Sequence, residues 1–455
     1  MAAPASSSFT SSFSGAQIVR LGLVQTALGS VVVLMTSTIN RVMVVELALP
    51  AIVPGALVAL HYAVQVLRPR WGYGSDVGGR RTPWIVGGMA ALALGGFLAA
   101  AATALAETNL PAGLSLAILA FFSVGIGAGA AGTSLLVLLA TGVEDRRRGA
   151  AATIVWVMMI AGFAVTAPLA GHFLDPFSGA RLVAVSGTVS LAAFVLACLA
   201  VRGVEPTVAP VRSETAGSAK APFRAVLTKV WSEPASRRFT VFIFVAMLAY
   251  SAQELILEPF AGLVFAMTPG TTTKLAGLQH GGVLAGMLLV AGLTMGVGGP
   301  WLGSLKLWTA LGCAGSGAML VGIAAGGLVG PEFPLRAVVF GLGLFNGVFA
   351  VAAIGSMMGL AGAGGEAERG TRMGVWGAAQ GVAFGAGGFL GTVAVDLARL
   401  VTPEAVHAYA TVFLAEALLF VLATLIALRI EHAGATRVPR AQRRAALDLR
   451  FEPRF

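Results

Sequence analysis

Charged residues are scarce in this chain of 455 residues. Asp, Glu, Lys and Arg make up 11% of it, against roughly 25% in an average soluble domain. Apolar residues make up 57%, and the mean hydropathy is +0.86. A soluble globule could not cover its surface with so few charges, and a disordered chain would be poor in apolar residues. The composition therefore predicts a polytopic helical membrane protein.

Cysteine is almost absent as well. The two cysteines, Cys198 and Cys313, both lie inside apolar runs, so they predict neither a disulfide framework nor a metal site. The first sixteen residues carry no charge and lack the basic segment that a cleavable signal peptide needs. We also find no nucleophile–base pair, no metal-ligand spacing and no nucleotide motif, and we therefore expect no enzymatic activity.

Twelve apolar stretches are long enough to cross the bilayer, which takes about 20 residues of helix. We expect two six-helix bundles, 19–202 and 239–429, separated by a hydrophilic cytoplasmic linker, 203–238. A cytoplasmic tail, 1–18, precedes them and a basic cytoplasmic tail, 430–455, follows. The predicted spans are 19–43, 50–68, 84–106, 113–141, 150–173, 180–202, 239–267, 275–296, 305–328, 335–362, 373–397 and 404–429.

The loops between these spans differ in basic charge. All but five of the 30 Lys and Arg residues fall on one side, which the positive-inside rule makes the cytoplasmic side, together with both termini. The net charge of +10 is mostly this bias. We expect no nucleic-acid binding, because no basic run is interleaved with exposed aromatic residues. Attraction of the basic tail to anionic lipid is the better secondary use.

The two halves carry a faint common pattern. Its members in the first half are Asp145, Arg148, Gly149, Trp156 and Asp175, and in the second half Glu366, Arg369, Gly370, Trp376 and Asp396. The offset between equivalent residues is 220 or 221 throughout. A constant offset indicates a duplication, and duplicated halves of six helices are typical of secondary transporters.

The loop between predicted spans 2 and 3 resembles the signature cytoplasmic loop of the major facilitator superfamily, G-x-x-x-D-x-x-G-R-R/K. The matching residues are Gly72, Asp76, Gly79, Arg80 and Arg81. Glycines permit a tight turn, and an aspartate there can accept hydrogen bonds at a helix end and pair with an arginine. The resemblance implies the major facilitator fold, with this loop as a conformational latch. The equivalent loop of the second half, 298–306, has lost the acid, and the loop after predicted span 10 adds Glu366 and Arg369 as candidate residues.

Polar residues inside the spans are the next candidates, because an ionisable group in the bilayer is costly unless it is paired or hydrated. They gather mainly in predicted spans 1, 2 and 7. Spans 1 and 7 hold corresponding places in the two halves, so we expect their polar residues to face each other. The candidate ligand or proton site comprises Asn40, Arg41, Glu46, His61, Gln65, Gln253, Glu254 and Glu258.

Several roles are open to these residues. Arg41 and Glu46 are five apart, a poor spacing for a pair on one helix face, and both could instead snorkel to the outer interface. Glu254 and Glu258 share a helix face, so they repel unless one is protonated or a cation lies between them. They could relay protons, or Glu258 could pair with Arg41. His61 could ligate a chlorin magnesium or be a hydrogen-bonded histidine of the bundle, and we predict no other metal.

Two polar segments carry a narrower resemblance. One runs from Ile39-Asn40-Arg41 to Asp76, and the other is Ala252-Gln253-Glu254-Leu-Ile-Leu-Glu258-Pro259-Phe260-Ala-Gly262. Both resemble the PucC/LhaA family, twelve-span major facilitator relatives of phototrophic bacteria, and the resemblance covers nearly the whole chain.

The resemblance implies assembly of light-harvesting antenna complexes in the bacterial inner, intracytoplasmic photosynthetic membrane. It implies partners as well: bacteriochlorophyll or its synthesis enzymes, and antenna polypeptides. Bacteriochlorophyll would be bound cargo rather than a required cofactor. The alternative is a proton-coupled secondary transporter that moves a small molecule by alternating access.

Overall fold

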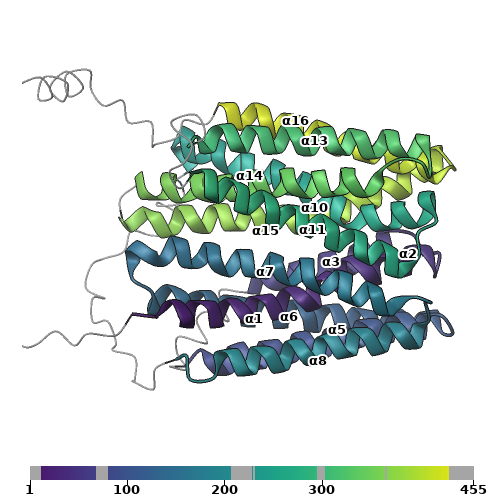
Figure 1. Ribbon diagram of the computed structural model, residues 1–455, viewed down its shortest axis with the longest axis horizontal. Helices are drawn as coiled ribbons and strands as arrows, with labels where there is room; N and C mark the ends of the chain where they lie inside the picture. The colour runs from purple at the N-terminus through teal and green to yellow at the C-terminus, as the bar shows by residue number, and fades with distance from the viewer. Residues whose placement is uncertain are drawn as a thin grey trace, which may run out of the picture.

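The computed structural model describes residues 12–67, 80–205, 228, 231–294, 303–363 and 366–429. All regular structure in this part of the chain is helical, and the helices lie roughly parallel in two groups (Figure 1). Eleven of the described helices are long and apolar enough to cross a membrane. The chain is therefore a multi-pass membrane protein, as its composition predicts.

The first half contains six helical segments. The first segment is continuous but changes its winding, from α1 (Gly15–Val33) through a π-helix, η1 (Leu34–Ile39), to α2 (Asn40–Val45). The others are α3 (Ile52–Val64) with a short 3₁₀ extension, η2 (Gln65–Leu67), then α5 (Thr82–Ala106), α6 (Leu110–Gly142), α7 (Asp145–Leu174) and α8 (Gly179–Val201).

The second half repeats this order with six more helices. They are α10 (Pro234–Phe265), α11 (Pro269–Gly292), α13 (Leu305–Val329), α14 (Leu335–Ala363), α15 (Glu366–Val401) and α16 (Ala405–Leu428). Each half has its own large buried apolar cluster. One cluster consists of first-half residues and Leu255, and the other lies wholly within α10 to α16. The expected pair of six-helix bundles is thus confirmed.

Some predicted boundaries need correction. The tail predicted at 1–18 ends earlier, because Ser14 and Gln17 cap each other and start α1 at Gly15. The second half starts at Pro234 rather than 239, since proline suits a first helical position, where no backbone N–H is needed. The second predicted span is a described helix of 13 residues, about 20 Å long, which is shorter than the bilayer core. The tail 430–455 lies outside the described residues.

The end of the bundle at which α2 leads to α3, α7 to α8 and α10 to α11 is called the outer end here (right in Figure 1).

Glycines bring α11 and α14 into backbone contact. A Cβ atom added at Gly282 or Gly286 of α11 would collide with a carbonyl oxygen of α14, and one added at Gly343 or Gly347 of α14 would collide with a carbonyl oxygen of α11. Small residues allow such close approach, which is how helices associate where no water drives them together. Close packing of α11 against α14 therefore accounts for these four glycines.

We predict that Gly343→Val destabilises the protein by about 1–3 kcal/mol, because the new side chain forces α11 and α14 apart. Gly281→Val on α11 is the matched control, since nothing lies within 4 Å of a Cβ atom at that position. Thermal unfolding in mild detergent measures both variants. Equal unfolding temperatures for the two variants would contradict this account of the packing.

Candidate functional site

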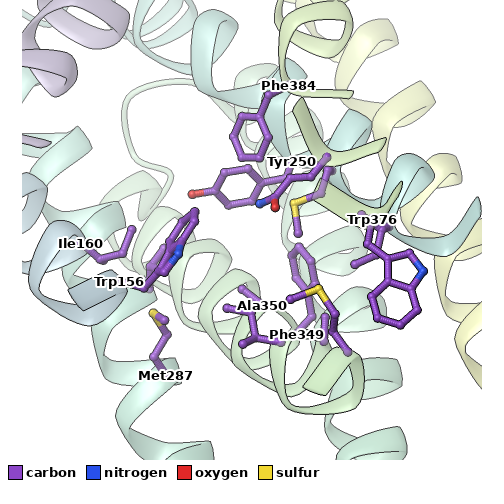
Figure 2. Close-up of a pocket in the computed structure, with 15 residues that line it drawn as sticks. Trp156, Ile160, Tyr250, Met287, Phe349, Ala350, Trp376 and Phe384 are labelled. Carbon is purple, nitrogen blue, oxygen red and sulfur yellow. The ribbon is translucent and has the colours of Figure 1, made fainter. Parts of the chain in front are cut away.

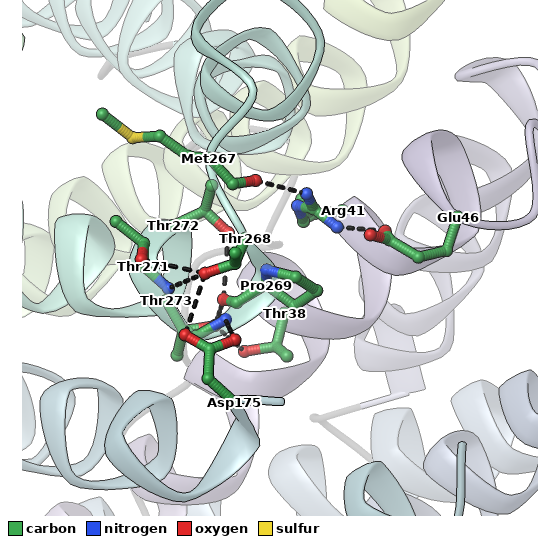
Figure 3. A network of polar contacts seen from close by, with 11 residues as sticks. Thr38, Arg41, Glu46, Asp175, Met267, Thr268, Pro269, Thr271, Thr272 and Thr273 are labelled. Atoms are coloured by element: carbon green, nitrogen blue, oxygen red, sulfur yellow. Dashed lines mark hydrogen bonds and ion pairs between the residues drawn. The ribbon is translucent and has the colours of Figure 1, made fainter. Parts of the chain in front are cut away.

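Near the outer end, Asn40 and Arg41 of the first span contact α10 and the turn that follows it, and Figure 3 shows Arg41 beside Met267. Of the predicted polar residues of α10, Glu258 lies near Arg41. The π-helix η1 turns the first span at the residues just before Asn40 and Arg41, and single π-turns inside helices are frequent at functional sites. Two contacts join the halves directly. Asn40 Nδ2 donates to the Leu255 carbonyl oxygen over 2.7 Å, and the Thr38 and Thr273 hydroxyl oxygens are 2.9 Å apart.

Arg41 is the central cation of this interface and is only 2% exposed. Its Nη1 forms an ion pair with Glu46, and its Nη2 donates to the Met267 carbonyl oxygen over 2.6 Å. The pair forms although a five-residue spacing is poor on one helix face, because the helix ends at Glu46 and frees that side chain to turn back. Arg41 does not reach the interface as a snorkelling residue would; it lies at the carboxyl end of α10, where the helix dipole favours a cation.

Glu258 lies in the same interface, on α10, and is 2% exposed. Its carboxyl group is next to Ser37 and Thr272 and within electrostatic reach of Arg41. Neither of its oxygens has a hydrogen-bond partner among the described residues. The suggested Glu258–Arg41 ion pair is therefore replaced by Arg41–Glu46. A buried carboxyl group in such surroundings can take up or release a proton.

Two aspartates close the outer end from opposite halves. Asp175, after α7, accepts hydrogen bonds from Gly270 N at 3.1 Å and from the Thr268 hydroxyl group at 2.8 Å, at the start of α11. Asp396, in α15, accepts hydrogen bonds from Ala51 N at 3.0 Å and Ile52 N at 2.7 Å, at the start of α3. Carboxylates are favourable at helix starts. These aspartates are equivalent in the repeat, so each half caps a helix of the other.

We predict that Asp175→Ala with Asp396→Ala lowers the free energy of unfolding by about 1 kcal/mol per cap. It also exposes a reporter cysteine at Ala51, which is buried beside Asp396, in a background lacking Cys198 and Cys313. Labelling by a membrane-impermeant maleimide from the outer side measures this exposure.

Asp175→Asn with Asp396→Asn is the matched control, because asparagine keeps the hydrogen-bond acceptor. The caps hold the outer end closed if the alanine variant is labelled faster than the asparagine variant. Equal labelling of the alanine variant and the parent protein would contradict that role.

The remaining predicted residues of α10 lie deeper in the bundle. Glu254 Oε1 is 4.0 Å from His280 Nε2 of α11, and His280 Nδ1 is 2.9 Å from the Ala276 carbonyl oxygen. Gln253 is fully buried, and neither atom of its amide has a hydrogen-bond partner in the described part of the chain. His280 was not among the predicted site residues. It lies on α11, the helix that follows α10, and the packing of these two helices brings it next to Glu254.

His61 is a bonded histidine of the bundle. Its Nε2 is 3.0 Å from Nε2 of Gln65, the first residue of η2, and its ring packs edge-on against Tyr62 with centroids 4.8 Å apart. These contacts favour a structural role for His61 over a role as a magnesium ligand. No group of three or more potential metal ligands (His, Cys, Asp or Glu) occurs in the described residues.

Only part of the predicted latch loop belongs to the described residues. Gly72, Asp76 and Gly79 are outside the described residues, whereas Arg80 and Arg81 directly precede α5. Glu366 and Arg369 form the first turn of α15. Sequence reasoning missed Glu205, which accepts hydrogen bonds from Arg81 N at 2.7 Å and Thr82 N at 2.9 Å. It thereby caps α5 from beyond the end of α8.

The surroundings of Glu205 change its acidity. Burial works to raise its pKa, but hydrogen bonds from the Arg81 and Thr82 backbone and from the Thr82 hydroxyl group, with the nearby charge of Arg80, outweigh burial and lower the pKa. A lowered folded-state pKa stabilises the fold above the unfolded-state pKa, and this contribution is lost as the pH falls through the folded-state value.

We predict that Glu205→Gln lowers stability at neutral pH by up to about 1 kcal/mol, because the helix start loses its anion. The stability difference between the variant and the parent protein has its full size at pH values well above the ordinary glutamate pKa of about 4.3. It disappears in stronger acid, where Glu205 is protonated in the parent protein. Unfolding temperatures across the pH range measure it, with exposed Glu332→Gln as the control. A pH-independent difference would contradict the role of the charge.

A largely apolar pocket with a volume of about 80 Å³ lies between the halves (Figure 2). Its walls come from α7 of the first half and from α10, α11, α14 and α15 of the second. Five aromatic residues line it: Trp156, Tyr250, Phe349, Trp376 and Phe384. No charged side chain occurs in the described lining. The only side-chain amide there belongs to Gln380.

Comparison with known proteins identifies the family. The family described as PUCC protein matches residues 38–435. The chain belongs to the PucC family. One relative is the Bacteriochlorophyll synthase 44.5 kDa chain of Rhodobacter capsulatus, 53% identical over 93% of this chain and 97% of its own length. Another is Protein PucC of Cereibacter sphaeroides, 30% identical over 81% of each chain.

A solved structure supports the fold of this PucC family member. It comes from work on substrate recognition in proton-dependent oligopeptide transporters, with a TM-score of 0.65 over 91% of this chain and 98% of that one. The sequence identity is 17%, so this likeness shows the fold alone. The fold is that of the major facilitator superfamily, as the sequence predicts.

Proposed function

We propose that this protein assists the assembly of light-harvesting complexes by handling bacteriochlorophyll in the membrane, without catalysing a reaction itself. The observation that carries the proposal is the extent of the likeness to a relative named for bacteriochlorophyll synthase. Identity of 53% runs over 97% of that relative, so the likeness includes both halves and the pocket between them. Bacteriochlorophyll, its synthesis enzymes and antenna polypeptides are the proposed partners, in the photosynthetic membrane.

The chemistry of the interface supports this proposal. A pigment with a large conjugated ring needs apolar and aromatic walls, and the pocket supplies them. The alternative, proton-coupled transport of a small molecule, draws on Glu254 and Glu258. A polar substrate would find no charged partner in the described lining of the pocket, which favours pigment handling.

The test uses a phototrophic host that lacks its own relative of this chain. We predict that the chain restores near-infrared antenna absorbance, and that Glu254→Gln with Glu258→Gln reduces the restored absorbance at equal protein level. The reason is that the Glu258 carboxyl group lies beside Ser37 and Arg41 of the first half, and that of Glu254 lies beside His280 inside the bundle. Glu404→Gln is the control, since Glu404 is exposed at the start of α16.

The tagged protein is then purified in mild detergent, and its pigments and partners are identified by absorbance and mass spectrometry. Recovery of bacteriochlorophyll with antenna polypeptides or pigment enzymes supports the proposal. Normal antenna absorbance without the chain would refute it. Substrate-dependent proton uptake into proteoliposomes, with no effect on the antenna, would establish the transporter instead.

A further inference from the structure

We infer that a cluster of buried oxygen atoms between the two halves binds one monovalent metal cation, for which sodium is the probe. This cluster, called the Glu258 cluster here, consists of Ser37, Asn40, Glu258 and Thr272. Ser37 and Thr272 lie next to the Glu258 carboxyl group. Asn40 contacts the same turn of α10, since its Nδ2 donates to the Leu255 carbonyl oxygen. The inference goes beyond the proposed function, because it does not depend on what the protein handles.

Several acceptor atoms of the Glu258 cluster lack a donor. Asn40 is 1% exposed and Glu258 is 2% exposed. Asn40 Oδ1, Ser37 Oγ and both carboxyl oxygens of Glu258 have no hydrogen-bond partner among the described residues. Buried oxygen atoms are costly without a partner. A ligand that offers positive charge to several oxygen atoms at once would satisfy them.

The threonine hydroxyl protons beside the cluster are already used. Thr272 and Thr273 both donate to the Pro269 carbonyl oxygen, over 3.1 and 2.8 Å (Figure 3). The Thr38 and Thr273 hydroxyl oxygens are 2.9 Å apart, so Thr38 is the donor of that pair. A hydroxyl group whose proton is used elsewhere presents lone pairs to its other neighbours. Thr272 therefore acts toward Glu258 as a further oxygen ligand rather than as a donor.

The charges at the cluster call for one more positive charge. The ionised side chains there are Arg41, Glu46 and Glu258, which sum to one negative charge. Glu46 already balances Arg41 in an ion pair. Glu254, one turn earlier on α10, has a neighbour of its own in His280. An unbalanced charge is costly within the bilayer, and one monovalent cation restores neutrality at Glu258.

A metal cation suits these groups better than a proton does. A proton on Glu258 would remove the charge, but it is a single donor and can serve only one of the remaining acceptors. Hard metal cations take lone pairs from several oxygen atoms at once, and they accept carboxylate and neutral oxygens together. The Glu258 cluster offers both kinds.

Both spans that form the cluster are interrupted where it lies. The π-helix η1 changes the winding of the first span at Ser37, and Pro259 lies inside α10 directly after Glu258. Proline has no N–H, so the Leu255 carbonyl oxygen four residues earlier loses its helical donor, and Asn40 replaces that donor. Interrupted helices at the interface of two repeats are where secondary transporters hold sodium ions.

The test measures thermal unfolding of the full-length protein in mild detergent over a series of sodium chloride concentrations. Choline chloride keeps the ionic strength constant. A ligand that binds only the folded state stabilises it increasingly as its concentration rises above the Kd. We expect the unfolding temperature of the parent protein to rise with sodium, and equilibrium binding of radioactive sodium to give one ion per chain.

Four variants test the assignment to the Glu258 cluster. Glu258→Gln removes the negative charge, and Glu46→Gln leaves Arg41 to balance Glu258, so both are expected to lose the sodium response. Glu416→Gln is the matched control and is expected to keep the response, because Glu416 is also a buried carboxyl group but lies on α16. Ser37→Ala removes one oxygen ligand and is expected to raise the Kd for sodium by about tenfold. It keeps the test valid if a charge variant does not fold.

Three results would overturn the inference. The first is a parent protein that sodium neither stabilises nor binds. The second is a sodium response of parental size in Glu258→Gln, or in Ser37→Ala if the former does not fold. The third is an unfolding temperature that depends on pH but not on sodium, in the parent protein and not in Glu258→Gln, since the cluster would then bind a proton alone. Pigments take no part in these measurements, so their outcome is separate from that of the proposed function.

Discussion

Polar groups inside a bilayer must find their partners within the protein, and the two halves of this chain supply partners to each other. Asp175 of the first half meets the start of α11, and Asp396 of the second half meets the start of α3. Arg41 meets the carbonyl end of α10. Helix ends have unsatisfied backbone groups, and water is absent from the membrane core. The described contacts at the outer end therefore join the two halves through helix ends.

Polar and apolar functions are separated along the bundle. The outer end carries Arg41 and, beside it, Glu258 among hydroxyl groups, and further ionisable groups, Glu254 with His280 and Glu416, lie inside the bundle. The pocket carries aromatic and methionine side chains, with Gln380 as the side-chain amide. A protein that moves ions or polar solutes would need charges where the ligand lies. Here Arg41, Asp175 and Asp396 join the halves, while the described lining of the pocket is apolar and aromatic.

Much of the fold was predictable, because the length of an apolar run decides whether it spans a bilayer and the constant offset reveals the repeat. The facing of Asn40 and Arg41 toward α10 followed from the equivalent places of spans 1 and 7. The Arg41–Glu46 pair was misjudged because spacing rules assume a helix that continues past Glu46. The outer caps could not be assigned, although Asp175 and Asp396 were noticed, because their partners lie 95 and 345 residues away.

The pocket was the least predictable feature. In the sequence, Trp156 and Trp376 stood out only as members of the repeated pattern. Their shared site depends on how five helices from two halves come together. Glu205 lies in a segment that resembles a linker in the sequence. Its role as a cap could not be predicted, because it depends on the chain after α8 lying next to the start of α5.

The most direct test of this account is a cryo-electron microscopy map of the protein isolated with its pigment from phototrophic membranes. The account predicts pigment density within the protein, between its two halves, with the Asp175 and Asp396 caps in place. Pigment density only on a lipid-facing surface would contradict it.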